Sequence, residues 1–267
     1  MNMIGRSALI TGGTQGVGAA IALSLAKAGV NLVLHGLQED ATALKTIEQC
    51  KSEGVRVAPI YCDLWQPIDI VLRQLGERSV AVEPELSLLV NNAGVFLDKP
   101  FLEVDDLIFD RTFDLNVKVG YFLTQFFAKR WIAGQVSGRV LFTASINGLL
   151  AESDHTVYDA SKAAVSSLVR SLCVALSPRN IRVNAIAPGL VRTPLTDQVL
   201  SRDEDALRWM QLHTPNNKVP DAAVCGPMAA FLLSDDAEHI HGQTIYIDGG
   251  MSAWQQPDLP ARLRGHL

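Results

Sequence analysis

The stretch Thr11–Gly18, TGGTQGVG, decides the fold of this chain. A short apolar run over 6–11 precedes it, and good helix formers that end at Gly29 follow it, before the buried run Val30–His35. Strand, glycine-rich turn, helix and strand in this order are the context in which such a turn binds a dinucleotide. Glycines let the backbone approach the pyrophosphate, and the helix N-terminus offers free N–H groups to its charge. An ordinary tight turn is the alternative, which the flanking elements disfavour.

The alternation of strands and helices continues along the rest of the chain. Further strands are predicted over Arg56–Tyr61, Leu86–Asn91, Gly138–Thr143, Ile181–Ile186 and Thr244–Ile247. Helices are predicted over Asp40–Ser52, Pro67–Ser79, Asp105–Ala133, Val157–Ala175 and Asp221–Leu233. This pattern is typical of a parallel sheet with crossover helices on both faces. We therefore predict an α/β protein with one Rossmann-like, doubly wound domain over residues 1–267.

Two segments break this rhythm. Residues 194–219 have mixed polarity and contain Trp209, Met210 and Pro215, so we expect a small substrate lobe before the last helix, with a plain surface excursion as the alternative. The C-terminal tail, 254–267, contains Pro and Arg and is expected to pack on a neighbouring subunit or to stay loose.

Composition excludes several classes of protein. The 267 residues are 48% hydrophobic, and the net charge of −5 without a basic block argues against nucleic-acid binding. No uncharged apolar run approaches ~18 residues, so no membrane span is expected. The first strand starts within the first few residues, which leaves no room for a signal peptide. Four scattered cysteines without a Cys-x-x-Cys pattern indicate reduced thiols and a cytoplasmic protein. His239 and His241 lack a third ligand nearby, so we expect no metal.

Tyr158 and Lys162 carry the strongest chemical signal. They lie four residues apart on a predicted helix, share one face, and follow Ser145 along the chain. A free phenol titrates near ~10, and a lysine ammonium one turn away favours the phenolate. Such a tyrosine beside a serine hydroxyl can move a proton on and off an alcohol oxygen. Alone, the pair also occurs by chance on solvated helix faces.

Taken together, the motifs resemble those of short-chain dehydrogenase/reductases of the roughly 250-residue type. The resemblance runs from Thr11 to Gly250 and includes the glycine loop, Asn91-Asn92-Ala93-Gly94, Ser145 with Tyr158 and Lys162, Pro188–Thr193 and Asp248-Gly249-Gly250. It implies a nicotinamide-dependent oxidoreductase acting on a secondary alcohol or its ketone.

The resemblance also implies roles for individual residues. Tyr158 would be the general acid–base, Lys162 would lower its pKa and hold the nicotinamide ribose, Ser145 would hydrogen-bond the substrate oxygen, and Asn116 would hold a water. A core asparagine satisfied by backbone is the alternative for Asn116, and a plain turn aspartate is the alternative for Asp63. Besides Tyr158 and Lys162, the cofactor-binding residues would be Gly12, Thr14, Gln15, Gly16, Val17, Gly18, His35, Gly36, Asp63, Leu64, Asn91, Ala93, Gly94, Pro188, Gly189, Val191 and Thr193.

The choice between NAD and NADP rests on the end of the second strand. Gly36 stands where NAD-preferring members carry an acidic residue, whereas Gln15 and Leu37-Gln38 stand where NADP-preferring members carry Arg or Lys. A 2′-phosphate needs a cation, and Glu39 and Asp40 would repel it. We therefore expect a weak preference for NAD, while a protonated His35 would permit NADP.

The substrate is expected to be a hydroxylated small molecule such as a sugar or polyol. Ser145, Asn147, His155, Tyr158 and Phe96 are the predicted substrate residues. Residues 31–36 resemble bacterial 3-hydroxybutyrate dehydrogenases, but Phe96, Asn147 and His155 depart from the carboxylate-binding pattern of those enzymes. A 3-oxoacyl-carrier-protein reductase and a hydroxy-acid dehydrogenase are alternative enzymes, and an idle dinucleotide-binding sensor is the non-enzyme alternative.

Family members of this length usually form tetramers, so a homotetramer is expected. The two long predicted helices would supply its interface through outward faces that carry Phe122, Phe126, Val165, Leu168 and Leu172.

Overall fold

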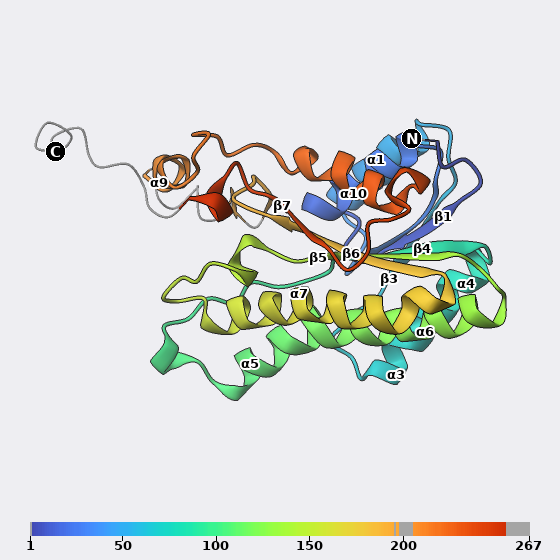
Figure 1. Cartoon of the computed structure of the whole chain (residues 1–267), viewed down its shortest axis with the longest axis horizontal. Coiled ribbons are helices and arrows are strands. Elements are labelled where there is room, and N and C mark those ends of the chain that lie inside the picture. Colours follow the sequence, from blue (N-terminus) through green and yellow to red (C-terminus); the bar gives the residue numbers. More distant parts are fainter. Residues whose placement is uncertain (1, 195, 198–204, 255–267) are drawn as a thin grey trace, which may run out of the picture.

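The chain folds into a parallel sheet with helices packed on both of its faces (Figure 1). The computed structural model describes residues 2–194, 196–197 and 205–254. Its seven-stranded sheet has the order β3-β2-β1-β4-β5-β6-β7, and every neighbouring pair is parallel. The strands are β1 (Ser7–Ile10), β2 (Asn31–Gly36), β3 (Val57–Tyr61), β4 (Leu86–Asn91), β5 (Gly138–Thr143), β6 (Ile181–Pro188) and β7 (Thr244–Ile247). The predicted doubly wound α/β class is confirmed.

Two helical layers cover the sheet, one on each side in Figure 1. One layer contains α1 (Gly16–Lys27), α2 (Ala41–Lys51) and α10 (Cys225–Leu233). The other contains α3 (Ile68–Val71), α4 (Arg78–Val82), α5 (Asp106–Phe113), α6 (Val119–Ala133) and α7 (Thr156–Leu176). The short helix α9 (Ala206–Leu212) belongs to the predicted substrate lobe, of which the structure describes only part. The predicted tail lies outside the described residues except for Trp254.

Each face of the sheet buries its own apolar cluster. Ile21 and Leu25 of α1 and Leu232 of α10 pack with alternate residues of the strands on one side. Phe127 of α6 and Val169 of α7 pack with the intervening strand residues on the other side. Both faces of the strands are therefore buried, which explains why they are continuous apolar runs in the sequence rather than alternating ones.

Two predicted helices contain π-helical segments. The expected helix over 105–133 is α5, a π segment over Asp114–Lys118, and α6. The expected helix over 67–79 is α3, a π segment over Leu72–Glu77, and α4, and it continues to Val82. A π segment inserts a residue into the helical register and is frequent at functional sites. The first of these segments contains Asn116.

The first helix begins three residues before the predicted start, at Gly16 rather than at Ala19. Gly18 lies in its first turn, where a Cβ would come within 2.1 Å of the carbonyl oxygen of Gly12. A side chain at this position would therefore clash with the backbone of the preceding loop, which requires glycine there.

The expected interface faces need one correction. Val165 was predicted to point outward but is only 1% exposed, because it packs in the core beneath the sheet. Phe126, Leu168 and Leu172 are partly buried against the same core. The large exposed apolar side chains of α6 and α7 are instead Tyr121, Ile132 and Val174.

Candidate active site

The predicted site residues converge at the carboxyl edge of the sheet. Strand order reverses at β1, which pairs with β2 on one side and with β4 on the other. Ligands of doubly wound sheets bind at the carboxyl ends of the strands beside such a switch point. The glycine loop follows β1, Asn92–Val95 follow β4, Ser145 follows β5 and Gly189 follows β6. Parallel strands therefore bring all four segments to this edge.

Asn92 connects three of these segments, and the sequence analysis did not single it out. Its amide nitrogen donates to the carbonyl oxygens of Thr11 and Gly12, both at 3.1 Å. Its amide oxygen accepts from the hydroxyl of Thr143 at 3.1 Å. The Thr11 hydroxyl in turn accepts the backbone N–H groups of Asn92 and Ala93, both at 2.9 Å. The signal was present, because Asn92 lies within the Asn-Asn-Ala-Gly motif.

His35 shapes the glycine loop from β2. Its Nδ1 accepts the N–H of Gly12 at 3.1 Å, and its Nε2 lies 3.0 Å from the carbonyl oxygen of Cys62. Burial lowers the pKa of this histidine. The ring is therefore held neutral, with Nε2 donating to the carbonyl, and neither ring nitrogen is free to receive a phosphate.

The N-terminus of α1 has the features of an anion site. Its N-cap, Gln15, makes no side-chain capping hydrogen bond, and the first turn contains no acidic residue. Gly12 and Gly16 adopt positive φ values of 59° and 55°, which turn the chain tightly into the helix. A Cβ at Gly16 would lie 3.7 Å from Thr193, so the loop after β6 closes over this turn. Uncapped N–H groups beside glycine fit a dinucleotide pyrophosphate.

At the end of β2 the backbone lies against the glycine loop. A Cβ at Gly36 would come within 2.9 Å of the Thr14 side chain, so the acidic residue usual at this position has no room. The next residue, Leu37, is 65% exposed. Asp40 caps α2 by accepting the N–H of Ala43 at 2.8 Å. Asp63 accepts the N–H of Trp65 through Oδ1 at 2.9 Å, as a turn aspartate does, and its other oxygen has no hydrogen bond among the described residues.

Tyr158 and Lys162 lie on one face of α7, as predicted. Burial raises the pKa of Tyr158, and a hydrogen bond with Ser145 opposes this rise. Lys162 is 5% exposed, and burial lowers its pKa to about 8. Its Nζ donates to the carbonyl oxygen of Thr143 at 3.0 Å and lies 5.6 Å from the centroid of the tyrosine ring. We expected this ammonium to lower the pKa of Tyr158, but the pKa is raised instead. Burial is the main cause of the shift in both groups.

Asn147 links Ser145 to two carboxylates. Its backbone N–H donates to the Ser145 hydroxyl at 3.2 Å. Its side-chain amide donates to Glu152 at 3.1 Å and to Asp159 at 3.0 Å. Asp159 also accepts the backbone N–H of Glu152 at 3.0 Å. Both amide protons of Asn147 are therefore used internally, and the sequence analysis missed Asp159, which is adjacent to Tyr158.

Phe96 and His155 form an aromatic wall beside Tyr158. The Phe96 ring meets the rings of His155 and Tyr158 edge-on, at centroid distances of 4.5 and 4.9 Å. His155 Nδ1 lies 3.4 Å from a Glu152 oxygen. The interaction with Glu152 raises the pKa of His155, and the same interaction is the main cause that lowers the pKa of Glu152. A smaller contribution to the lowered pKa of Glu152 comes from His213, just beyond α9.

Asn116 clamps the loop after β4 to α7. Its Oδ1 accepts the N–H of Val95 at 2.8 Å, and its Nδ2 donates to the Val95 carbonyl at 3.1 Å and to the Ser161 hydroxyl at 3.0 Å. A Cβ at Gly94 would lie 2.9 Å from Asn116 Oδ1 and 3.5 Å from Lys162 Nζ. The Asn116 side chain is thus hydrogen-bonded within the protein, in agreement with the alternative of a core asparagine. These contacts already use its amide, so a water in the site would have to be held by other groups.

Three residues expected to line the cofactor have buried side chains. The Asn91 amide donates to Thr124 of α6 at 3.0 Å, inside the protein. Leu64 and Val191 belong to the two apolar clusters. These residues can present only their backbone to a ligand. Gly189 packs closely against Asp248, because a Cβ added at Gly189 would lie 2.7 Å from the Cα of Asp248. The Asp248-Gly249-Gly250 segment therefore supports the loop after β6.

Comparison with known proteins places the whole chain among nucleotide-dependent enzymes. Residues 12–252 match the family model described as enoyl-(acyl carrier protein) reductase. An L-rhamnose 1-dehydrogenase (NADP(+)) from Thermoplasma acidophilum is 31% identical, and the alignment covers 92% of this chain and 96% of that protein. An L-rhamnose-1-dehydrogenase from Scheffersomyces stipitis is 33% identical over 92% of this chain and 96% of the relative.

A solved structure agrees with this similarity. A putative 2-deoxy-D-gluconate 3-dehydrogenase from Agrobacterium tumefaciens, with bound NADP, superposes with a TM-score of 0.86 at 30% identity. The superposition covers 95% of this chain and 98% of that one. Among the described residues of the present structure, no helix is long and apolar enough to cross a membrane.

Proposed function

This chain belongs to the short-chain dehydrogenase/reductase family, and we propose that it oxidises a secondary alcohol of a sugar or polyol, or reduces the matching ketone, with NAD preferred over NADP. It is a nicotinamide-dependent oxidoreductase of CH–OH groups in hydroxylated small molecules. The idle-sensor alternative is thereby excluded. The class of sugar, the preferred dinucleotide and the residue roles are the proposal.

The observation that carries the choice of substrate is the polar wall beside Tyr158. Glu152 is half-exposed, and its carboxylate is held in the charged form beside His155. A carboxylate accepts hydrogen bonds from hydroxyl groups, and an imidazole N–H donates them. Adjacent hydroxyls of a polyol supply both partners, whereas a simple aliphatic chain would leave these groups unpaired at a cost. Relatives named for rhamnose and for deoxygluconate support the same class.

The chemistry follows from the positions of three side chains. Bound dinucleotide supplies the hydride acceptor or donor, and the protein handles the proton. Ser145 orients the substrate oxygen, held by its hydrogen bonds with Asn147 and Tyr158. Tyr158 takes the alcohol proton during oxidation or returns it during reduction. Lys162 lies close enough to Tyr158 for its positive charge to favour the phenolate, an effect that the burial of both groups opposes.

The preference for NAD follows from the end of β2. The described residues place no cation in hydrogen-bond or ion-pair contact with Gly36, Leu37 or Gln38, and His35 is neutral and fully used. Glu39 and Asp40 lie near Tyr61, where their charges contribute to raising its pKa after burial. A 2′-phosphate left without a partner here should cost about 1–3 kcal/mol. One similar enzyme is named for NADP(+) and one similar structure contains NADP, so the preference for NAD over NADP most needs measurement.

A substrate screen tests the proposal. Sugars, polyols, hydroxy acids and a 3-oxoacyl thioester are each assayed with NAD and NADP by nicotinamide absorbance. We expect turnover with a sugar or polyol, and Glu152→Gln should raise KM for it more than it lowers kcat. A simple cyclic alcohol is the matched control, since its KM should not respond to Glu152→Gln. Turnover of the thioester or a hydroxy acid with no sugar or polyol would contradict the proposed substrate class.

A further inference from the structure

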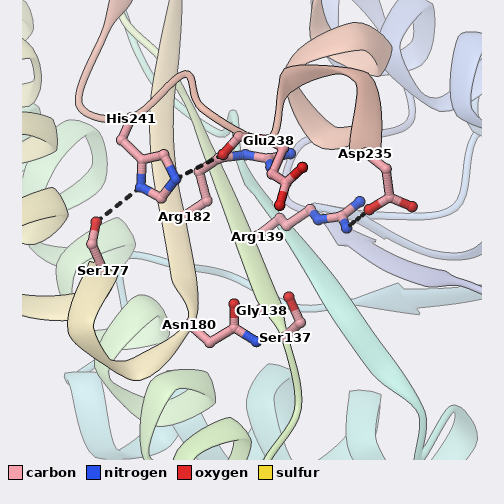
Figure 2. Close-up of a pocket in the computed structure, with 9 residues that line it drawn as sticks. All are labelled: Ser137, Gly138, Arg139, Ser177, Asn180, Arg182, Asp235, Glu238 and His241. Carbon is pink, nitrogen blue, oxygen red and sulfur yellow. Dashed lines mark hydrogen bonds and ion pairs between the residues drawn. The ribbon is translucent and has the colours of Figure 1, made fainter.

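A second pocket lies at the opposite edge of the sheet from the candidate active site (Figure 2). It has a volume of about 340 Å³ and opens at the amino ends of β5 and β6. Its walls come from those two strands, from the end of α7, and from the segment between α10 and β7. The lining residues are Ser137, Gly138, Arg139, Ser177, Asn180, Arg182, Asp235, Glu238 and His241.

Arg139 and Arg182 extend from neighbouring strands beneath the C-terminal end of α10. Nη1 of Arg139 donates to the carbonyl oxygen of Leu233 at 2.7 Å, and its Nη2 pairs with Asp235. Both side chains are more than nine-tenths buried, and Arg182 is 7% exposed. Arginines near a helix C-terminus stabilise its unpaired carbonyls, so part of each guanidinium has a structural purpose.

Arg182 has donors left over after this capping. Its Nη2 donates to the carbonyl oxygens of Leu232 at 3.0 Å and of Ser234 at 2.6 Å. Its Nε is buried and has no partner among the described residues, and no hydrogen bond reaches its Nη1 there. Guanidinium has five N–H donors and cannot accept, so the unpaired Nη1 can still donate to an acceptor in the pocket, whereas Nε is sealed from it. A buried donor left unpaired is unfavourable.

The charges around the pocket favour an anion. Asp235 is shared between Arg6 and Arg139, at the edge of the pocket. Glu238 is the other carboxylate in the lining, and it makes no ion pair among the described residues. Burial, and next the neighbouring Arg139, lower the pKa of Arg182 to about 10. The lining therefore holds two guanidiniums and two carboxylates, and Arg6 adds a third guanidinium through its pair with Asp235.

The remaining walls offer donors or are fixed in place. Ser177 and His241 Nδ1 are 2.9 Å apart, and His241 Nε2 donates to the Glu238 carbonyl at 3.0 Å, so both ring nitrogens are used (Figure 2). Asn180, in the left-handed conformation at φ 58°, has no side-chain hydrogen bond among the described residues. The Asn180 amide lies beside Ser137 in Figure 2, apart from the arginines, and adds a second kind of donor to the lining.

We propose that this pocket binds a small oxyanion, phosphate or a carboxylate, through Arg182 Nη1, with the Asn180 amide on its wall. The bound anion would join the amino ends of β5 and β6 to the segment after α10. Because the pocket lies on the edge opposite Tyr158, binding should stabilise the fold without competing with the reaction. Ligand that binds only the folded state raises its stability in proportion to the logarithm of its concentration.

The test follows the melting temperature of the full chain with saturating dinucleotide, so that the pyrophosphate position of the glycine loop is already filled. Inorganic phosphate, sulfate, acetate and citrate are titrated against chloride at matched ionic strength. We expect a saturable rise in melting temperature with phosphate or with the carboxylates. Which of the two classes of anion gives the rise identifies the class that the pocket binds. No rise beyond that of chloride with any of these anions would overturn the proposal.

A carboxylate introduced on the pocket wall provides the specific variant. Asn180→Asp adds a negative charge to the lining and should weaken anion binding at least tenfold. Asn217→Asp is the matched control, since Asn217 is an exposed asparagine with φ 55° elsewhere on the surface. Anion binding that is equal in Asn180→Asp and Asn217→Asp would show that the anion binds elsewhere and would refute the assignment.

Discussion

Replacing Lys162 by methionine should stabilise the protein at neutral pH while it abolishes activity. Burial lowers the pKa of Lys162 from 10.5 to about 8. At about 1.36 kcal/mol for each tenfold change in proton affinity, the buried ammonium costs the folded state about 3 kcal/mol. Losing the hydrogen bond to the Thr143 carbonyl offsets about 1 kcal/mol of that gain. We therefore expect the free energy of unfolding to rise by about 2 kcal/mol at pH 7.

The stability difference between Lys162→Met and the wild type should depend on pH. Below pH 8 the lysine is protonated in both the folded and the unfolded wild type, so the cost is constant. Between pH 8 and 10.5 the folded state has lost the proton while the unfolded state keeps it, so wild-type stability from this group rises with pH. The advantage of Lys162→Met should therefore shrink across this window and end as a small deficit.

Urea unfolding followed by circular dichroism, at fixed subunit concentration and without dinucleotide, measures both effects at pH 7 and about pH 10. Lys129→Met is the matched control, because Lys129 is exposed and bonded only to Gln125, and its effect should be near zero at both pH values. A less stable Lys162→Met at pH 7, or a stability difference that does not change with pH, would refute the reasoning.

Four further outcomes are expected. Tyr158→Phe should lower turnover by roughly two to four decades with little change in dinucleotide affinity, and near-normal turnover would contradict its role. In the wild type, oxidation should speed up with rising pH and reduction should slow, because burial raises the pKa of Tyr158 and oxidation needs its phenolate. Leu37→Arg should narrow or invert a roughly ten- to hundredfold preference for NAD, measured by titrating both dinucleotides, since it adds a donor fork beside the ribose. Sedimentation should show a tetramer that Val174→Glu weakens, because Tyr121, Ile132 and Val174 leave apolar surface exposed; a monodisperse wild-type monomer would refute this.

The fold was largely predictable because its signals are local. The bounds of β4, β5 and β7 match the predicted runs, since buried parallel strands leave short continuous apolar segments between breakers. The π segments were not predictable in the same way. Apolar residues at helical spacing are compatible with α and π hydrogen bonding alike, so periodicity showed one helix where the backbone changes register around Asn116.

The residues proposed for the site could be gathered from the sequence, but their electrostatics could not. Ser145, Tyr158 and Lys162 were identified from spacing and resemblance, and the fold brings them together. The neutral state of His35 depends on the carbonyl of Cys62, just after β3, and on an N–H of the glycine loop, which only the tertiary structure brings to one ring. The pKa of Lys162 likewise depends on the depth of its burial, which spacing along one helix does not reveal.

The two sides of the site are therefore built under different constraints. Tyr158 and Lys162 sit where burial disfavours their charged forms, so most substitutions there change stability and activity together. Glu152 and His155 are only partly buried, and they are held through Asn147 rather than through the core. Exchanging these side chains costs little of the fold, because surface substitutions rarely shift stability much. Under the proposed function, substrate choice can thus vary at this wall while the proton-transfer groups remain fixed, so the wall, rather than the shared motif, would distinguish one hydroxylated molecule from another.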